Sequence, residues 1–206
     1  MPRLLPESLE RVRRGIQDAA LGLFVTQGYT ATTTRQIAAA TGLTVGALYK
    51  HYPNKEALFA AVATGYQKRL ARDEENNPLL AVIQKTRFPD DLRELAFAIR
   101  ELISNNKSYW LLWYIDVLEF GSKHFQQRLA PESLVGSPAL DRRFEELRKE
   151  GRFRVDPKLA FVMVYMHLFN YFLVESVFSA KQHYGVSEEE AVDAIIDVFL
   201  RGMLNE

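Results

Sequence analysis

The sequence predicts an all-α fold, in which a small three-helix domain at residues 1–54 precedes a larger helical domain at residues 55–206. Apolar residues recur at the three- and four-residue spacing of amphipathic helices along most of the chain. Capping residues, glycines and prolines divide this pattern into helices, and no stretch shows the two-residue period of a strand. With 206 residues, 48% of them hydrophobic, the chain is long enough for one or two domains with a buried core.

Charge and cysteine content narrow the possible functions. Of the 26 basic and 26 acidic residues, seven basic and three acidic ones fall within 1–55, which leaves 19 basic and 23 acidic ones for the remainder. This asymmetry favours a basic domain that contacts phosphate and an acidic body that does not. The chain has no cysteine, which excludes disulfides, thiol catalysis and cysteine metal sites and fits a reducing cytoplasm.

Two stretches bear on targeting and membrane insertion. The first residues, up to Arg14, have no long apolar core and no cleavage site, so we expect no signal peptide. Leu159–Phe178 approaches the length of a membrane span, but it contains His167, Asn170 and Glu175, which are costly in lipid. We therefore expect a buried helix and a cytoplasmic protein.

The first helix is expected from Glu10 to Gln27, where Gly28 ends it, and Tyr29 is expected to plug the small core. Five apolar residues at core spacing support this helix. They are Ile16, Ala19, Ala20, Leu23 and Phe24.

Two short helices joined by a tight turn are predicted next. Thr33 can cap the first of them, and Gln36 stands three residues on, where it can close a capping box. Gly42 stands where that helix needs a left-handed residue to end, and Thr44 can cap a second helix from Val45. Such a pair is a helix-turn-helix, and the small residues that begin its second helix suit close approach to base edges in the major groove.

The larger domain is expected to be a series of helices with clear start signals. Asn54 can cap the first, Asp156 with Pro157 can begin a later one, and Ser187 with Glu190 can form a second capping box. The expected ranges are 55–73, 79–85, a helix to 104 capped by Asp90 or Asp91, 107–122, 139–149, 157–181 and 187–204, with a loop at 130–138.

A longer set of residues over roughly 10–60 matches one family in order and spacing. The set is Ile16, Ala19-Ala20, Leu23-Phe24, Gly28-Tyr29, Thr32-Thr33, Ile37-Ala38, Gly42, Gly46, Leu48-Tyr49, His51-Tyr52, Lys55-Glu56 and Leu58. It resembles the N-terminal signature of TetR-family transcriptional regulators, with small departures at Thr41 and Leu43-Thr44. The resemblance implies a homodimeric DNA-binding regulator whose C-terminal domain binds a small molecule.

DNA contacts are expected on the two short helices and at the start of the next one. In the resembled family the positions of Tyr49 and Lys55 usually touch phosphate, and Lys55 also stands at a helix N-terminus, which favours an anion. Arginine, lysine and small apolar side chains on these helices can reach base edges. The expected set is Thr33, Thr34, Arg35, Thr44, Val45, Gly46, Ala47, Tyr49, Lys50, His51 and Lys55, although each residue taken singly also fits a plain surface role.

Aromatic and polar residues of the larger domain are candidates for a ligand pocket. An apolar cavity with a few orienting polar groups is the usual small-molecule site, and the resemblance favours one here. The alternative is that the aromatic residues are solid core and His167 is a satisfied buried histidine. The expected lining is Tyr109, Trp110, Trp113, Tyr114, Asp116, Phe161, Tyr165, Met166, His167, Phe169 and Asn170, with Glu119 and Glu175 as further polar groups.

No catalytic signature is visible. The sequence contains no glycine-rich phosphate loop, nucleophile elbow or H-E-x-x-H motif, and no histidine stands at metal-ligand spacing from Asp116 and Glu119. We expect no enzyme, metal or cofactor.

The leading hypothesis is a repressor released from a palindromic operator by a small, largely apolar or aromatic ligand, with helix 55–73 transmitting the change to the DNA-binding helices. The alternatives are a ligand-independent or activating DNA-binding regulator, and a helical enzyme or carrier.

The last two helices are expected to form a homodimer. Helix 157–181 is apolar nearly all round, which is more than one protomer can cover. The final helix carries a stripe through Ala191, Ile195, Phe199 and Met203, beside the small residues Ala194 and Gly202. Two such helices from each chain would form a four-helix bundle about a two-fold axis. The competing interpretation packs the stripe inside its own protomer.

Overall fold

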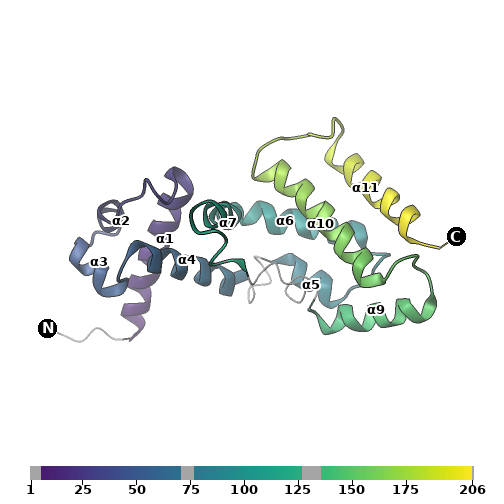
Figure 1. Ribbon diagram of the computed structural model, residues 1–206, viewed down its shortest axis with the longest axis horizontal. Helices are drawn as coiled ribbons and strands as arrows, with labels where there is room; N and C mark the ends of the chain where they lie inside the picture. Colours follow the sequence, from purple (N-terminus) through teal and green to yellow (C-terminus); the bar gives the residue numbers. More distant parts are fainter. Residues whose placement is uncertain (1–5, 71–76, 127–135, 206) are drawn as a thin grey trace. The chain divides into compact units, whose positions relative to one another are not determined.

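The computed structural model describes residues 6–70, 77–126 and 136–205, which are mostly helical (Figure 1). Within these ranges there is no strand, and the extended pairing is limited to an antiparallel bridge between Phe153 and Leu204. The predicted all-α class is therefore confirmed. The helices are α1 (Pro6–Gln27), α2 (Thr34–Ala40), α3 (Val45–His51), α4 (Lys55–Leu70), α5 (Pro78–Gln84), α6 (Leu92–Asn105), α7 (Lys107–Phe120), α9 (Pro138–Glu150), α10 (Pro157–Ser176) and α11 (Glu188–Met203).

Contacts between residues divide the chain into two compact units. The first contains residues 1–69 and 108–126, and the second contains residues 70–107 and 127–206. Nearly all of α4 and α7 thus belongs to the same unit as the three N-terminal helices. This unit therefore extends beyond the domain boundary that the sequence predicted after residue 54. That boundary was drawn to separate functions, and it stays a prediction.

The capping signals in the N-terminal part act as the sequence predicts. The Thr33 hydroxyl accepts a hydrogen bond from the Gln36 N–H at 3.2 Å, and the Gln36 side chain accepts one from the Thr33 N–H at 2.8 Å. Gly42 takes the left-handed conformation at φ +68°, and the Thr44 hydroxyl accepts the Ala47 N–H at 3.1 Å. These confirmed caps fix where α2 ends and where α3 begins.

Later capping signals are also confirmed. Asp156 accepts hydrogen bonds from the N–H groups of Lys158 and Leu159, and Pro157 occupies the first turn of α10. Ser187 and Glu190 form the capping box that begins α11. Asn54 accepts the Ala57 N–H at 2.7 Å at the start of α4. Local sequence therefore sets the starts of all three helices.

Several helix ends differ from expectation. α1 begins at Pro6 rather than at Glu10. α10 stops at Ser176 rather than near residue 181, because the Glu175 carboxylate accepts the backbone N–H groups of Gln182 and His183 and turns the chain back. Asp91 does occupy the N-cap position of α6, but its carboxylate accepts the Arg87 N–H at 2.6 Å instead of capping the helix. The expected helix residues 71–73, and the loop at 130–138 up to residue 135, lie outside the described residues.

The core of the first unit is aromatic. Phe24 of α1 and Phe59 of α4 are fully buried, with ring centroids 5.6 Å apart. Tyr29, from the turn after α1, lies 5.5 Å from each of these rings, and Phe120 at the end of α7 lies 4.7 Å from Tyr29. Tilted and edge-on contacts at these distances are favourable. Tyr29 therefore plugs this core, and α7 contributes to it.

Helix α10 is central to the second unit. Its buried Phe161 lies 5.2 Å from Phe88 and 5.7 Å from Phe144 of α9, measured between ring centroids. Tyr165 and Phe169 continue this line of stacked rings, each 6.1 Å from the one before. α10 also has the length and apolar composition of a membrane span, and 50% of its most apolar stretch is buried inside the chain. A core helix of a soluble protein has the same two properties.

Ion pairs hold the start of α11 against α6. Arg93 pairs with Asp193, and Arg100 donates a hydrogen bond of 2.8 Å to Glu188. The two guanidinium groups lie over the Phe97 ring, 5.5 and 4.8 Å from its centroid. Each exposed pair contributes little to stability by itself, but together they define the register of α11 on α6.

Candidate nucleic-acid interface and effector-site residues

Helix α3 presents its first turn to solvent. Thr44 and Gly46 are exposed, Val45 and Ala47 are half-buried, and Leu48 packs into the core. A Cβ added at Gly46 would meet no atom within 4 Å, so the space around it is open. The start of α3 therefore offers small side chains and accessible backbone, which is the surface needed for close approach to base edges.

Exposed polar side chains surround this turn. Arg35, Tyr49 and Lys50 are all exposed, and the Tyr49 hydroxyl lies 3.5 Å from that of Thr34, which links α3 to α2. Within the described residues neither Arg35 nor Lys50 forms an ion pair. Both charges are thus available to an anionic partner.

Thr33 and His51 lie at the two ends of the motif. The Thr33 hydroxyl is part of the capping box, where it also donates to the Gln36 side chain at 2.8 Å, so it is partly used within the fold. His51 is half-buried as the last residue of α3.

Lys55 is engaged inside the chain. Its ammonium donates to the carbonyl oxygens of Tyr29 at 2.7 Å and Thr32 at 2.8 Å, with Thr30 further away at 3.4 Å. It also lies 4.1 Å from the centroid of the Tyr29 ring. Burial lowers the pKa of the Lys55 ammonium, while the charge of Glu119 acts in the opposite direction. Lys55 therefore holds the turn between α1 and α2 in place, a role that sequence reasoning missed.

The end of α7 is tied to the helix-turn-helix core by polar and aromatic contacts. Glu119 accepts a hydrogen bond from the Thr30 hydroxyl at 2.8 Å, and Lys123 pairs with Glu56 of α4 at 2.6 Å. Phe120 lies 4.8 Å from Phe59, measured between ring centroids. The sequence showed no pattern that would reveal these contacts, because each joins residues far apart in the chain.

Asp116, an expected orienting group of the ligand pocket, is fully buried and already satisfied. Its carboxylate accepts the N–H groups of His124 and Phe125 at 3.0 and 3.1 Å and lies 2.6 Å from His124 Nδ1. The side chain therefore closes the turn after α7. Among the described residues no three His, Asp or Glu side chains are arranged to hold a metal ion.

The expected pocket residues divide between the two units. On α7, Tyr109 and Trp110 are buried, Trp113 is half-buried and Tyr114 is 37% exposed. On α10, Phe161, Tyr165 and Phe169 are buried, whereas Met166, His167 and Asn170 are exposed. Burial raises the pKa of the Tyr165 phenol to about 12. Phe161 is enclosed by Phe88 and Phe144, so it is a core residue.

His167 is not the buried histidine of the alternative interpretation, and its role as a ligand contact stays a prediction. It is exposed, its Nε2 lies 3.3 Å from the Tyr184 hydroxyl, and its ring lies 5.5 Å from Phe199. The histidine therefore belongs to an aromatic contact between α10 and α11 near the surface.

Exposed apolar residues form one face on α10 and another on α11. On α10 they are Leu159, Met163 and Met166, exposed by 51, 47 and 40%, which follow each other at helical spacing. On α11, Val198 is 68% exposed and stands between the exposed residues Ala194 and Gly202. These two faces are the surfaces on the last two helices that one chain leaves uncovered.

The stripe expected at the dimer interface lies mostly inside the protomer. Ile195 and Met203 are only 6 and 7% exposed, Ala191 is buried, and Phe199 is half-buried. The competing interpretation of that stripe therefore holds for Ala191, Ile195 and Met203. The physical reason is that α11 has two adjacent apolar stripes, and the one with the larger side chains faces its own core.

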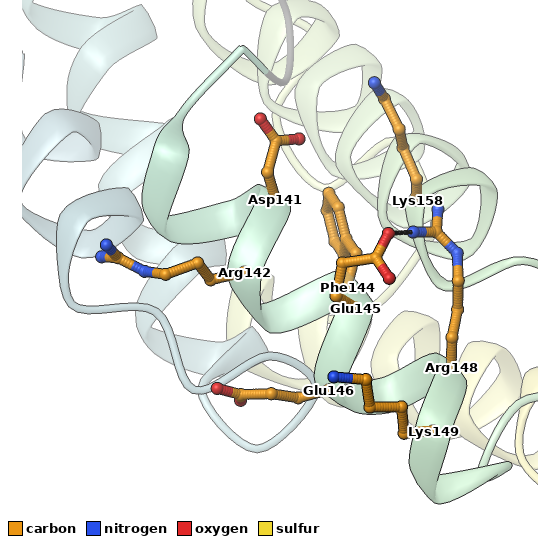
Figure 2. A pocket seen from close by; sticks show the side chains of 8 residues that line it. All are labelled: Asp141, Arg142, Phe144, Glu145, Glu146, Arg148, Lys149 and Lys158. Carbon is orange, nitrogen blue, oxygen red and sulfur yellow. Dashed lines mark hydrogen bonds and ion pairs between the residues drawn. The ribbon is translucent and has the colours of Figure 1, made fainter.

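An open depression on α9 is lined mainly by charges of both signs (Figure 2). Arg148 lies 2.5 Å from Glu145 and donates to Asp156 at 2.7 Å. The bond from Arg148 and the N–H groups of Lys158 and Leu159 lower the pKa of the Asp156 carboxyl, although burial opposes them. The lining has four basic and three acidic side chains, so the depression offers only a small net positive charge to a ligand.

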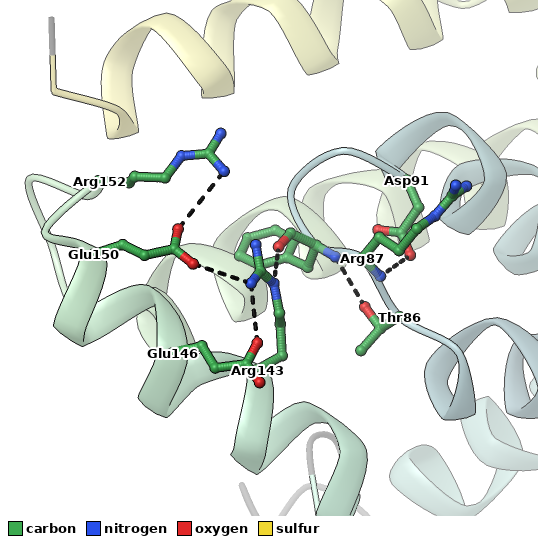
Figure 3. Close-up of polar contacts among 8 residues, drawn as sticks. Thr86, Arg87, Asp91, Arg143, Glu146, Glu150 and Arg152 are labelled. Carbon is green, nitrogen blue, oxygen red and sulfur yellow. Dashed lines mark hydrogen bonds and ion pairs between the residues drawn. The ribbon is translucent and has the colours of Figure 1, made fainter.

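Arg143, on the same helix, ties α9 to the segment before α6 (Figure 3). Its guanidinium donates to the Phe88 carbonyl oxygen at 2.8 Å and pairs with Glu146 and Glu150 at 3.1 and 3.4 Å. Arg152 continues the network, 3.9 Å from Glu150. The network is structural, since its charges pair with each other.

An exposed recognition helix on a three-helix core, followed by further helices, defines a helix-turn-helix protein with a helical companion unit. Residues 16–62 match the family model described as bacterial regulatory proteins of the tetR family. An HTH-type transcriptional regulator of Shigella flexneri, AcrR, is 32% identical over 105 residues, which are 49% of this chain and 46% of the relative. A transcriptional repressor of Mycobacterium tuberculosis is 33% identical over 84 residues, 41% of this chain and 45% of the relative. The alignments thus span less than half the length of these two relatives.

Solved structures match over nearly the whole chain. A TetR-family regulator of Mesorhizobium loti superposes with a TM-score of 0.67 at 21% identity, covering 96% of this chain and 98% of that one. SmeT, the repressor of a multidrug efflux pump of Stenotrophomonas maltophilia, gives 0.55 at 22% identity, covering 94 and 91%. At this identity the likeness shows the fold. The chain therefore shares the fold of these solved structures, and its residues 16–62 match the tetR-family model.

Proposed function

We propose that the protein is a transcriptional repressor that binds a palindromic DNA operator in the cytoplasm. The observation that carries this proposal is the open first turn of α3, flanked by Arg35 and Lys50, which form no ion pair with any residue that the structure describes. Small side chains allow close approach, and basic side chains supply contacts to guanine or phosphate. The proposed DNA contacts are Thr34, Arg35, Thr44, Val45, Gly46, Ala47, Tyr49 and Lys50, with secondary roles for Thr33, His51 and Lys55.

The operator complex requires two copies of the chain. One α3 offers too few contacts for tight specific binding, and paired recognition helices bind half-sites about one DNA turn, roughly 34–36 Å, apart. We place the dimer interface on α10 and α11, as the sequence suggested, but on different residues of α11. The exposed apolar faces through Met163 and Val198 fit an isologous contact that buries both.

A small, largely apolar or aromatic effector is proposed to release the DNA. Its candidate contacts are Tyr109, Trp110, Trp113 and Tyr114 of α7 and, as a separate candidate set, Tyr165, Met166, His167, Phe169 and Asn170 of α10. The side chains of Phe161 and Asp116 are enclosed or satisfied and are less suited to a ligand. The contacts of Glu119, Phe120 and Lys123 with the turn after α1 and with α4 supply a route by which displacement of α7 would reach the helix-turn-helix. The effector must bind the DNA-incompetent arrangement more tightly than the competent one.

A gel shift separates this proposal from its alternatives. A duplex selected from a random library should bind the protein, and added apolar or aromatic compounds should reduce the binding. Failure of every random duplex to be enriched would indicate a helical enzyme or carrier instead. Binding that no compound in a broad panel changes would favour a ligand-independent regulator.

A further inference from the structure

A groove between α1 and α4 holds a side chain that links three helices. The groove is lined by Gln17 of α1 and by Ala60, Ala61, Thr64, Gly65 and Lys68 of α4. Its α4 wall consists mostly of small residues, so the backbone of α4 is accessible to the Gln17 side chain. Gln17 is the long polar side chain that α1 contributes to this groove.

One end of the Gln17 amide is bonded to the end of the recognition helix. Its Nε2 donates a hydrogen bond of 2.9 Å to the hydroxyl oxygen of Tyr52. Tyr52 is the C-cap residue of α3, it is 8% exposed, and its own N–H donates to the Leu48 carbonyl oxygen at 3.0 Å. The phenol is thus fixed at its ring by burial and at its hydroxyl by Gln17.

The other end of the amide fits against a glycine of α4. A Cβ added at Gly65 would lie 2.9 Å from Gln17 Oε1 and 3.8 Å from its Cδ. By contrast, a Cβ added at Gly15 or Gly22 of α1 would meet no atom within 4 Å. The position of the Gln17 amide therefore depends on the distance between α1 and α4 at Gly65.

We propose that Gln17 is a positioning residue for DNA binding, which couples the packing of α4 on α1 to the C-terminal end of the recognition helix. A displacement of α4 against α1 changes the space for the Gln17 amide and with it the bond to Tyr52. The position of the C-terminal end of α3 therefore depends on α4 through the Gln17 side chain, which does not itself contact DNA. The effect on DNA binding rests on the proposed function, but one of the two tests below measures the coupling without DNA.

The first test uses Gly65→Ala with Gly22→Ala as its matched control, in the full-length dimer. Both substitutions replace a helical glycine by alanine and raise helix propensity alike, but only the first displaces the Gln17 amide. Since the amide is the end of a flexible side chain, it moves aside and the fold is retained. Gly65→Ala should weaken operator binding by about three- to tenfold, the effect of losing one net hydrogen bond, and Tyr52→Phe should do the same.

A double-mutant cycle identifies Gln17 as the cause. In a Gln17→Ala background, which is itself weaker than wild type, Gly65→Ala should produce no further loss, because the amide that it displaces is gone. Losses that multiply in the double variant would overturn the proposal, as would a Gly65→Ala protein that binds as tightly as Gly22→Ala.

The second test measures amide hydrogen exchange without DNA. The amides of Leu48 and Tyr52 should exchange faster in Gly65→Ala than in Gly22→Ala, because the end of α3 has lost its anchor. Equal exchange in the two proteins would overturn the proposal. If the wild-type protein binds no DNA while the exchange difference is present, the proposed function fails and the Gln17 coupling remains.

Discussion

The Lys55 ammonium lies 2.7 Å from the carbonyl oxygen of Tyr29, and its cation also sits over the Tyr29 ring. This lysine at the start of α4 thus fixes the turn that leads from α1 into α2. The contact makes the orientation of the helix-turn-helix depend on α4, the helix that the sequence already suggested as the one transmitting the change to the DNA-binding helices.

Lys55→Ala should therefore destabilise the protein. The Thr32 carbonyl oxygen would lose its lysine donor, whereas the Tyr29 carbonyl oxygen would keep the Thr32 N–H at 3.1 Å. A buried acceptor left unsatisfied costs about 1–3 kcal/mol. Lys50→Ala is the matched control, since Lys50 is exposed and forms no ion pair within the described residues. Denaturant unfolding gives the free energy of unfolding of each variant. Equal values for Lys55→Ala and Lys50→Ala would contradict the structural role of Lys55. If Lys55 also touches phosphate, its variant reduces the salt slope of DNA binding by about one unit.

Lys50→Ala should relax sequence preference while leaving stability unchanged. Lys50 lies near the open first turn of α3, where a basic side chain can donate to guanine acceptors. Losing one such contact costs about 1–3 kcal/mol of discrimination at that base position. Binding measured on a set of single-base operator variants shows the effect. A variant with an unaltered preference would remove Lys50 from the base-reading residues.

Phe161→Ala and Trp113→Ala should behave differently. Phe161 is enclosed by Phe88 and Phe144, so its truncation should cost about 3–5 kcal/mol of unfolding free energy. Trp113 is half-buried and is a candidate effector contact, so its truncation should alter the response to effector more than operator affinity. Thermal melts compare the stabilities of the two variants, and gel shifts with and without effector compare their operator binding. Unfolding by Trp113→Ala as severe as by Phe161→Ala would make Trp113 a core residue.

Val198→Glu should dissociate the dimer without unfolding the protomer. Val198 is 68% exposed in one chain, so a charge there harms only a surface that a second copy covers. Leu118→Glu is the control, since Leu118 is 84% exposed and belongs to α7, which is not one of the proposed interface helices. Light scattering should give a monomer for the first variant and a dimer for the second. A dimeric Val198→Glu protein would place the interface elsewhere.

Asp156→Asn should remove a component of stability that depends on acid pH. Because the folded pKa of Asp156 is lowered, its contribution is fully present above the unfolded pKa of about 3.9 and is lost as the pH falls through the folded value. The stability difference between wild type and variant should therefore be constant near neutral pH and shrink below about pH 4. Asp141→Asn, at an exposed position on α9, is the control. A difference that does not change with pH would rule out this linkage.

The fold was largely predictable because its signals are local. Thr33 with Gln36, Gly42 and Asp156 each act within a few residues of their own position, so their spacing in the sequence reveals them. The roles of Lys55 and Asp116 were not predictable in the same way. Lys55 bonds to carbonyl groups more than twenty residues earlier, and Asp116 closes a turn whose path the sequence does not show.

The face of α11 illustrates a second limit of sequence patterns. Ile195 and Val198 belong to adjacent apolar stripes on the same helix, and periodicity gives both the same weight. Only the packing of α11 against α6 and α10 shows that Ile195 is buried and Val198 is exposed. The sequence therefore identified the helix α11, but it did not identify which of its faces is exposed to solvent.

The most direct test of the account is selection of duplexes from a random DNA library by the full-length protein, followed by sequencing of the bound fraction. A dimer with two exposed α3 helices should enrich one palindromic sequence with half-sites about 10 base pairs apart, bound by two copies of the chain. Recovery of no common sequence, or equal binding to selected and unselected DNA, would contradict it.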